Sequence, residues 1–259
     1  MSPSIPQSHP RYRSLATREK LVAAAMEGLV AWEGLIAHGR GEAFDYLLGE
    51  RTVPEAEVAA RAAVAYLLRA DHPVLSVNGN VAVLVADEVG ELAAATGARV
   101  EVNVFHRTEK RVDALVARLE GRGIPEVLGR GPDASLPGLD HPRALCNRKG
   151  IYGSDVVLVP LEDGDRAEAL VGMRKAVLSI DLNPLSRTNQ AATVAIVDEV
   201  VRALRFMVAF AREVKGRPKD VETARRAYEK QANLRGVLGV IWKNLETRTR
   251  PGEKAGDNV

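Results

Sequence analysis

Short apolar runs alternate with segments of helical periodicity between residues 73 and 200, and this alternation constrains the fold more than any other feature of the chain. Six runs predict strands, the third of them weak: residues 74–77, 100–105, 126–128, 155–159, 176–180 and 193–197. Helices are predicted between them, over residues 81–95, 109–119 and 165–171. Strands that alternate with helices are typical of βαβ units. The pattern therefore predicts an α/β fold with a mainly parallel sheet flanked by helices.

Helical segments flank this core on both sides. Ser14 is a suitable N-cap for one long amphipathic helix that continues to Ile36, and a second helix is predicted from Thr52 to about Ala70. Beyond residue 200, two helices are predicted on either side of a break at residues 215–220, followed by a frayed polar tail from Thr247. We expect an N-terminal helical segment, an α/β core and a helical C-terminal region in one compact unit: residues 1–72, 73–200 and 201–259.

The composition excludes several classes of partner. Thirty-six Lys and Arg stand against 34 Asp and Glu, so the net charge of +2 gives no field that would attract nucleic acid or an anionic membrane. Cys146 is the single cysteine, which excludes an intrachain disulfide, and the His and Cys residues do not have zinc-site spacing. Apolar runs are too short to span a membrane and the first 13 residues lack a signal-peptide pattern. We expect a cytoplasmic protein with small-molecule ligands.

A glycine-rich polar segment, residues 38–42, separates two apolar helical patterns and is predicted to form a tight corner that holds an anion. Gly39 and Gly41 would let the backbone approach a ligand, and Arg40 offers a planar fork of donors for phosphate or carboxylate. The alternative, weighted equally, is a helix C-cap glycine followed by a surface turn. Arg18, aligned with the apolar stripe of the preceding helix, either extends along the surface or contacts a ligand.

Polar residues follow several predicted strands, where ligands bind in open parallel sheets. Asn78, Gly79 and Asn80 follow the first strand, either as an anion site or as an ordinary capped turn. The fourth strand is followed by a cluster that either binds Mg²⁺ or forms a salt-bridged loop: Glu162, Asp163, Asp165 and Arg166. Residues 129–153, rich in Gly, Pro and charge, form a long excursion suited to a binding loop or an interface arm.

The fifth strand ends in the most polar of these segments, residues 181–188. Asp181 directly follows a buried strand and must be hydrogen-bonded or paired. Pro184 favours extended geometry at Asn183, which would bring Ser186, Arg187 and Thr188 back as a donor-rich loop suited to a polyphosphate. The chain lacks the sequence motifs of a P-loop, of a dinucleotide-binding glycine loop and of a nucleophile elbow.

Five separated sequence blocks together resemble the archaeal phosphopantothenate synthetase family, also called 4-phosphopantoate–beta-alanine ligases. They are IPQSHPRYRSLATREKL, AHGRGEAFDYLLGERT, SVNGN, VPLEDGDRAEALV and IDLNPLSR, in consistent order from Ile5 to Ala203. The resemblance implies a Rossmann-like fold, a homodimer and ATP-dependent condensation of (R)-4-phosphopantoate with β-alanine. The products would be 4'-phosphopantothenate, AMP and diphosphate, on the archaeal route to coenzyme A. Residues 131–153 match only in part, and the chain beyond Arg205 does not match well enough to transfer residues.

The resemblance also implies a set of ATP contacts. They are Arg18, Arg40, Asp181, Leu182, Asn183, Arg187, Thr188, Glu199 and Val200, the last two through the main chain.

An acyl adenylate is the chemically natural intermediate, since a carboxylate is a poor electrophile. Arginines, backbone amides and Mg²⁺ would stabilise the charge that develops as two anions meet. Within the polar corner, Arg40, His38 and Glu42 are the candidates for catalysis.

Other roles are less constrained. The candidates for binding the substrate anion are Arg11, Asn78 and Asn80, with His38 as a further possibility. The base for the amine is open among Glu42, His38 and Asp163, and no metal ligands can be assigned. The alternative function is a non-catalytic regulatory module that binds a nucleotide or a sugar phosphate.

Overall fold

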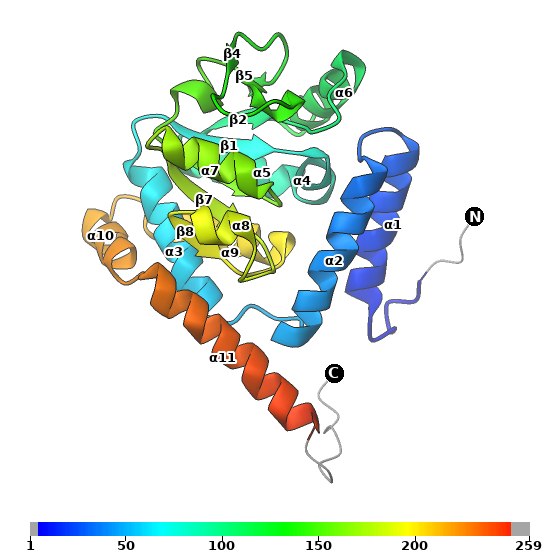
Figure 1. The fold of residues 1–259 in the computed structure, drawn as a ribbon, viewed down its shortest axis with the longest axis vertical. Helices are drawn as coiled ribbons and strands as arrows, with labels where there is room; N and C mark the ends of the chain where they lie inside the picture. Colours follow the sequence, from blue (N-terminus) through cyan, green and yellow to red (C-terminus); the bar gives the residue numbers. More distant parts are fainter. Residues whose placement is uncertain (1–4, 250–259) are drawn as a thin grey trace.

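The computed structural model describes residues 5–249 and centres on a six-stranded parallel sheet (Figure 1). The strand order is β3-β2-β1-β6-β7-β8, and every neighbouring pair is parallel. The bounds are β1 Pro73–Val77, β2 Arg99–Val102, β3 Val127–Leu128, β6 Val156–Pro160, β7 Ala176–Ile180 and β8 Val194–Ile196. β1 and β6 are buried along their whole length, as expected for strands covered on both faces. All six predicted strands are therefore confirmed.

Helices cover both faces of the sheet. One face carries α3 (Pro54–Arg69), α5 (Ala86–Thr96), α6 (Glu109–Glu120) and α9 (Val200–Glu213). The other carries α7 (Gly164–Gly172) and α8 (Arg187–Ala191). The α/β prediction is confirmed. The predicted helix over residues 81–95 is instead two helices, α4 (Gly79–Leu84) and α5, because the backbone of Val85 leaves helical geometry.

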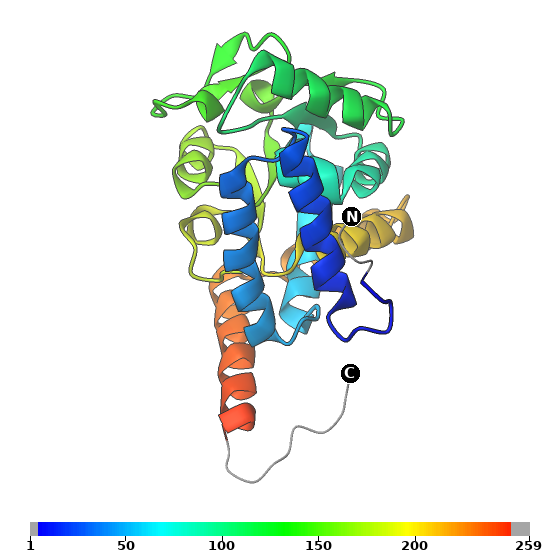
Figure 2. The same cartoon turned by 90° about the vertical axis from the view of Figure 1, so that its right-hand side faces the viewer.

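The N-terminal segment is a helical hairpin, α1 (Tyr12–Met26) and α2 (Trp32–Leu48), at the edge of the molecule (Figures 1 and 2). The prediction of one long helix to Ile36 is wrong, because Gly28 adopts a left-handed conformation with φ +76° and reverses the chain. The predicted apolar stripe of Val22, Met26, Leu29 and Ile36 is also wrong except at Leu29, which is buried. Met26 and Ile36 are 76% and 72% exposed. The side of α1 that faces the core carries Leu21 and the small residues Ala24 and Ala25, which let the helix pack closely.

The predicted tight corner at residues 38–42 does not exist, since these residues lie in the middle of α2. Neither Gly39 nor Gly41 has a positive φ, so neither is needed for a turn. A Cβ on Gly41 would lie 3.6 Å from Cδ1 of Leu182, two residues after the end of β7, which is an ordinary van der Waals distance. Gly41 therefore marks where α2 lies against the segment after β7, not where the helix ends. The equally weighted C-cap alternative is wrong for the same reason, because α2 ends at Gly49.

The excursion over residues 129–153 contains a two-stranded antiparallel ribbon, β4 (Ala134–Ser135) and β5 (Leu145–Cys146). Two 3-10 turns complete it, Pro142–Ala144 and Ile151–Gly153. Polar contacts fasten it to the sheet: the buried carboxylate of Glu101 on β2 accepts backbone N–H bonds from Asn147 and Ile151, at 2.8 and 2.6 Å. The excursion is thus an ordered layer beside the strand ends.

The C-terminal region has three helices where two were predicted. After α9 come α10 (Pro218–Arg226) and α11 (Lys230–Thr249). The predicted break is partly α10, which begins with Pro218 at a position where proline is tolerated. α11 runs beside α2 (Figure 2). The predicted tail is helical to Thr249, and the rest of it lies outside the described residues. Within residues 5–249, no helix is both long and apolar enough for a membrane span.

Candidate active site

The strand order reverses between β1 and β6, and Asn78 lies at this point. Its amide nitrogen donates to the carbonyl oxygens of Pro160 and Leu161 at 3.0 and 3.1 Å, and its amide oxygen accepts from the N–H of Val81 at 3.1 Å. Asn80 donates to the Gly34 carbonyl at 3.0 Å and so joins α4 to α2. Both asparagines therefore lie at the predicted crevice, with their amides used in joining its walls.

The segment after β7 is a compact turn built from its own side chains. Asp181 accepts from the N–H of Asn183 at 2.9 Å, and Asn189 donates to the carbonyls of Asp181 and Asn183 at 3.0 and 2.8 Å. Burial raises the pKa of Asp181, against the opposing effects of the Asn183 N–H, Ser186 and the positive charge of Arg40. Ser186 accepts from the N–H of Asn189 at 3.1 Å and caps α8. The predicted hydrogen bonding of Asp181 is confirmed.

Helix α2 lies over this turn and carries Arg40 toward Asp181. Within residues 5–249, Arg40 makes no hydrogen bond or ion pair, and it is exposed. A guanidinium without a partner leaves positive charge at the end of β7, whereas the N–H and hydroxyl donors of the turn itself are already bonded. The two segments singled out in the sequence, residues 38–42 and 181–188, thus lie side by side although more than 130 positions separate them.

Two other arginines at the hairpin, Arg18 and Arg11, are already bonded. Arg18 of α1 binds Glu42 of α2 with 2.7 Å between Nη2 and Oε2, and it also donates to the Tyr46 hydroxyl. Arg11 donates to the same hydroxyl at 2.6 Å. Burial lowers the pKa of His38, and its Nε2 lies 3.8 Å from Glu42, too far for a hydrogen bond. Glu42 is therefore committed to Arg18, and His38 is neutral near pH 7.

An ion network anchors α2 to α9, and it was not predicted from the sequence. Arg202 reaches Asp45 at 2.5 Å and Asp198 at 2.8 Å, and Asp198 also accepts the Thr52 hydroxyl at 2.7 Å. Glu199 caps α9 by accepting the N–H groups of Val201 and Arg202. The carboxylate of Glu199 is thereby occupied, and its backbone is bonded as well: its N–H donates to Asp198 at 2.8 Å and its carbonyl oxygen accepts from the N–H of Ala203 at 2.9 Å.

The acidic cluster after β6 is a salt-bridged loop, one of the two arrangements expected. Arg143, from the excursion, binds Glu162 at 2.6 Å and Asp163 at 3.2 Å. Arg166 is fully buried and also pairs with Glu162. His141 pairs with Asp165 at 2.9 Å. No group of three or more metal-binding side chains occurs in the part of the chain that the structure describes.

The phosphate-contact candidates Arg187 and Thr188 begin α8. Thr188 donates to the backbone carbonyl of Glu162 at 2.7 Å, while Arg187 pairs at the surface with Glu168 at 2.8 Å. Gly164, at the start of α7, lies against the backbone and Cβ of Arg187, so that a side chain at Gly164 would meet it. The first turns of α7 and α8 are therefore in direct contact at the strand ends.

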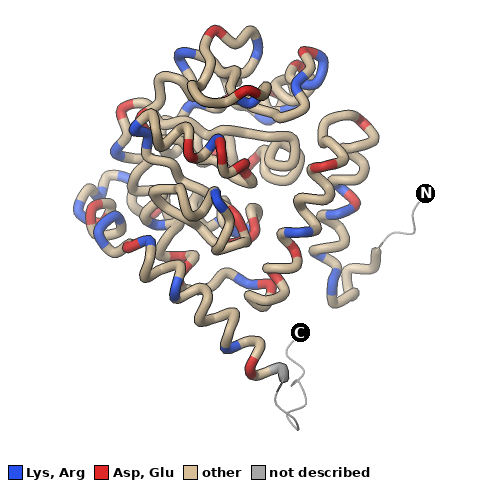
Figure 3. Tube along the Cα trace, in the orientation of Figure 1, with Lys and Arg blue, Asp and Glu red and all other residues tan. Residues whose placement is uncertain are grey.

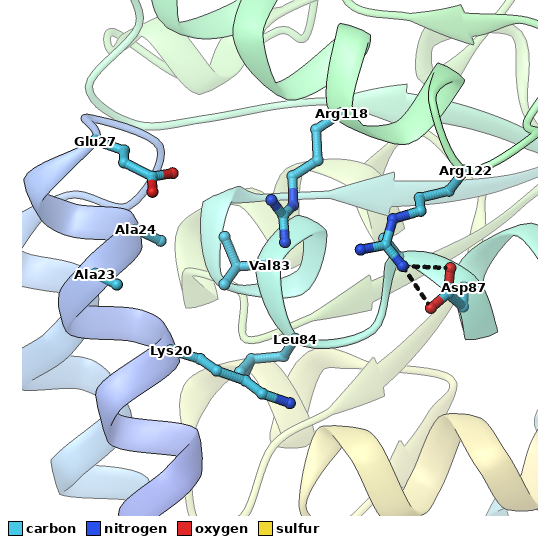
Figure 4. Close-up of a pocket in the computed structure, with 10 residues that line it drawn as sticks. Lys20, Ala23, Ala24, Glu27, Val83, Leu84, Asp87, Arg118 and Arg122 are labelled. Atoms are coloured by element: carbon cyan, nitrogen blue, oxygen red, sulfur yellow. Dashed lines mark hydrogen bonds and ion pairs between the residues drawn. The ribbon is translucent and has the colours of Figure 1, made fainter. Parts of the chain in front are cut away.

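A separate hollow of about 340 Å³ lies between α1, α4, α5 and α6 (Figure 4). Its walls include Lys20, Glu27 and Arg118, and the ion pair between Arg122 and Asp87 closes one side. None of the site residues predicted from the sequence lines it. Elsewhere Lys and Arg alternate with Asp and Glu along the elements (Figure 3), in keeping with the low net charge.

Comparison with known proteins identifies this arrangement. Residues 55–244 match the model of the phosphopantothenate/pantothenate synthetase family. A 4-phosphopantoate–beta-alanine ligase of Methanosarcina mazei is 53% identical over 244 residues, which cover 94% of this chain and 96% of that relative. The chain belongs to the phosphopantothenate/pantothenate synthetase family. Ligases of the same name from Methanospirillum hungatei and Thermococcus kodakarensis are each 56% identical, over 81% and 82% of this chain and 86% and 82% of their own lengths.

Membership of this synthetase family confirms the resemblance found in the five sequence blocks. The matched region contains the turn after β7 and the first turn of α9, but it begins after the α1–α2 hairpin. The relative from Methanosarcina mazei covers more of the chain than that region does. Likeness to these relatives is therefore not confined to the sheet.

Proposed function

We propose that the protein is a 4-phosphopantoate–beta-alanine ligase that forms 4'-phosphopantothenate, AMP and diphosphate in coenzyme A biosynthesis. The observation that carries this proposal is the 53% identity with a ligase of that name over 94% of the chain. The site supports it, because cations and backbone donors surround the strand ends at which two anionic substrates would have to meet. The reaction joins a carboxylate to an amine and needs activation of the carboxylate first.

The proposed route has two steps. A carboxylate oxygen of phosphopantoate attacks the α-phosphorus of ATP, and diphosphate leaves with the electrons of the broken P–O bond. The amine of β-alanine then attacks the acyl carbon, AMP leaves as the C–O bond breaks, and the amine loses a proton to a base. Holding the substrates in reactive geometry can contribute roughly 7 to 11 kcal/mol to such a reaction.

The proposed nucleotide site joins α2 to the ends of β7 and β8. The residues are Arg18, Arg40, Asp181, Leu182, Asn183, Arg187, Thr188, Glu199 and Val200. Arg40 is the cation available without breaking an ion pair, so it is assigned to the phosphates. To bind a phosphate, Arg187 would give up its exposed ion pair with Glu168. This costs little free energy, because surface ion pairs contribute about 0–1 kcal/mol.

Catalysis is assigned to the polar face of α2. Arg40 would stabilise the charge at the α-phosphorus, where an oriented cation is most effective. His38 and Glu42 are assigned a supporting role, since Glu42 already holds Arg18 and His38 is neutral. Mg²⁺ is proposed to arrive on the ATP phosphates as part of the substrate. The carboxylates after β6, Glu162, Asp163 and Asp165, do not fit a protein-held ion, because each is paired with Arg or His.

The substrate anion is assigned to Arg11, Asn78 and Asn80. Arg11 is exposed and its partner is a neutral phenol, so its charge is available to a phosphate. The asparagines lie at the start of α4, beside the crevice between β1 and β6.

We propose a homodimer in the cytoplasm. The outer face of the hairpin exposes Met26, Trp32 and Ile36, a group of large apolar side chains that a second copy would cover. Light scattering after size exclusion tests this assignment, and a monomer at micromolar concentration would contradict it. Substituting both Met26→Glu and Ile36→Glu should shift a dimer to monomer.

The decisive experiment supplies purified protein with MgATP, phosphopantoate and β-alanine and measures AMP and diphosphate. The ligase predicts release that requires phosphopantoate. The alternative, a nucleotide- or sugar-phosphate-binding regulatory module, predicts ATP binding without diphosphate release under the same conditions. The identity of the relatives does not favour this alternative.

A further inference from the structure

The imidazole of His141 is held in a fixed orientation at the strand ends. Its Nε2 lies 2.9 Å from Oδ2 of Asp165, in the first turn of α7. One face of the ring stacks on Phe105, with 5.1 Å between the ring centroids and an angle of 25° between the planes. Phe105 is itself 44% exposed, so a ligand at the strand ends can contact this stack. A carboxylate and an aromatic ring thus fix the imidazole from two directions.

The hydrogen bond to Asp165 determines which nitrogen of His141 can accept a proton. Burial acts to raise the pKa of Asp165, but the bond from His141 and the N–H of Arg166 leave it lowered, so the carboxylate is ionised at pH 7. An ionised carboxylate accepts a hydrogen bond, so Nε2 carries the hydrogen and Nδ1 keeps its lone pair. Nδ1 is buried and has no hydrogen-bond partner among the described residues. A basic nitrogen is therefore present without a structural use.

The segment that carries His141 is rigid. The guanidinium of Arg143, two residues later, is held by Glu162 and Asp163. Asn103, just after β2, donates to the carbonyl oxygens of Arg143 and Leu145 at 3.3 and 2.9 Å. A side chain on such a segment keeps its position without help from a ligand, as a catalytic group requires.

His141 lies beside the proposed phosphate contacts. Asp165 is one residue from Gly164, which packs on Arg187, and the charge of Arg187 acts on Asp165. The charged groups that face the ring are the carboxylates of Asp163 and Asp165, with Arg187 next to them. His141 is therefore close to where the acyl phosphate bond would form and break.

We propose that His141, oriented by Asp165, is the general base that accepts the proton of the β-alanine amine, an inference that rests on the proposed ligase function. As an aliphatic amine, β-alanine is an ammonium ion at pH 7 and cannot attack until it loses a proton. Nδ1 takes that proton, the neutral nitrogen forms its bond to the acyl carbon, AMP leaves with the electrons of the C–O bond, and the phosphate of the departing AMP takes the second proton from the nitrogen. The charge on the imidazolium is balanced by Asp165.

The other candidates fit this role less well. Glu42 is held by Arg18, and Asp163 by Arg143. His38 is neutral, but no carboxylate lies within hydrogen-bonding distance to fix its tautomer. His141 alone among these four has a bonded carboxylate on one nitrogen and a vacant second nitrogen.

The test separates the two steps of the reaction in His141→Gln. Phosphopantoate-dependent exchange of diphosphate into ATP reports adenylate formation, which needs no base, and should stay within about threefold of wild type. Amide formation with β-alanine should fall by about 10²–10⁴-fold, the usual contribution of a general base. Hydroxylamine, which is unprotonated at pH 7, should react with the adenylate at the wild-type rate. Asp165→Asn should show the same split.

His106→Gln is the matched control, because His106 also contacts Phe105 but pairs with Glu33 at the surface. It should leave both steps unchanged. If His141→Gln and Asp165→Asn each lost exchange, hydroxylamine reaction and amide formation equally, the pair would have a structural role. That result would overturn the inference. Unchanged amide formation in His141→Gln would also overturn it. Absence of exchange in the wild-type protein would overturn the ligase proposal itself, a result that the variants alone cannot give.

Discussion

The buried carboxylate of Glu101 accepts the backbone N–H of Ile151 at 2.6 Å, so a titratable group in the sheet holds the excursion in place. Burial raises the pKa of Glu101 from 4.5 to about 7, although the N–H groups of Ile151 and Asn147 oppose the rise. The unfolded chain therefore loses this proton at lower pH than the folded one. The stability associated with protonated Glu101 is complete below about pH 4.5 and is lost as the pH rises through 7.

The free energy of unfolding should accordingly fall between pH 5 and 8 by up to about 3 kcal/mol from this group. Urea unfolding at a series of pH values measures it. Glu101→Gln, which cannot ionise, should have a flatter profile over the same range. Parallel profiles for the two proteins would show that Glu101 does not titrate there.

Arg40→Ala should raise the KM for ATP at least about tenfold or abolish turnover, because it removes the unpaired cation above the turn after β7. Its melting temperature should match that of wild type, since Arg40 makes no ion pair within residues 5–249. Arg212→Ala, which breaks an exposed pair with Glu91, is the control for loss of one positive charge. An unchanged KM for ATP in Arg40→Ala would remove this residue from the nucleotide site.

Arg202→Met should destabilise the protein by about 3–5 kcal/mol, because it leaves the buried carboxylates of Asp45 and Asp198 without their cation. Arg205→Met, one helical turn along, removes only an exposed pair with Glu88 and should cost about 1 kcal/mol or less. Chemical denaturation of both variants measures the difference. Equal losses would mean that the buried network contributes no more than a surface pair.

Gly164→Ala should separate α7 from α8, since the added methyl group would meet the backbone and Cβ of Arg187. We expect a loss of about 1–3 kcal/mol in stability and a raised KM for ATP. Gly172→Ala, at the other end of α7, adds the same methyl group where no atom lies within 4 Å and should leave both quantities unchanged. Steady-state kinetics and thermal unfolding of the pair distinguish a local displacement from a general effect on the helix.

The sheet was predictable from the sequence because burial on both faces makes its strands apolar along their length, as in residues 156–159. The polar residues after β1 and β7 could be found because ligands bind beyond the carboxyl ends of the strands in a parallel sheet. Gly39 and Gly41 were misread because the sequence does not distinguish a glycine in a helix from a glycine in a turn, and only their helical backbone, without a positive φ, does so.

The site residues that were not predicted from the sequence were missed for a different reason. Arg202 meets Asp45 across 157 positions, and Arg143 meets Glu162 across 19, so neither pair has a local signal. His141 lies in the excursion, whose length and composition predicted a binding loop or an interface arm but singled out no residue in it. The outward face of α1 was misjudged because its core side is lined by alanines, which give a weak apolar pattern beside Val22 and Met26.

The hairpin of α1 and α2 carries Arg18 and Arg40 on one piece, joined to α3 by residues 49–53. The positions of both side chains relative to the turn after β7 therefore depend on how α2 is held against its neighbours. The ion pair between Asp45 and Arg202 holds the C-terminal part of α2 against α9. The two proposed ATP contacts of the hairpin would thus depend on an ion pair that includes neither arginine.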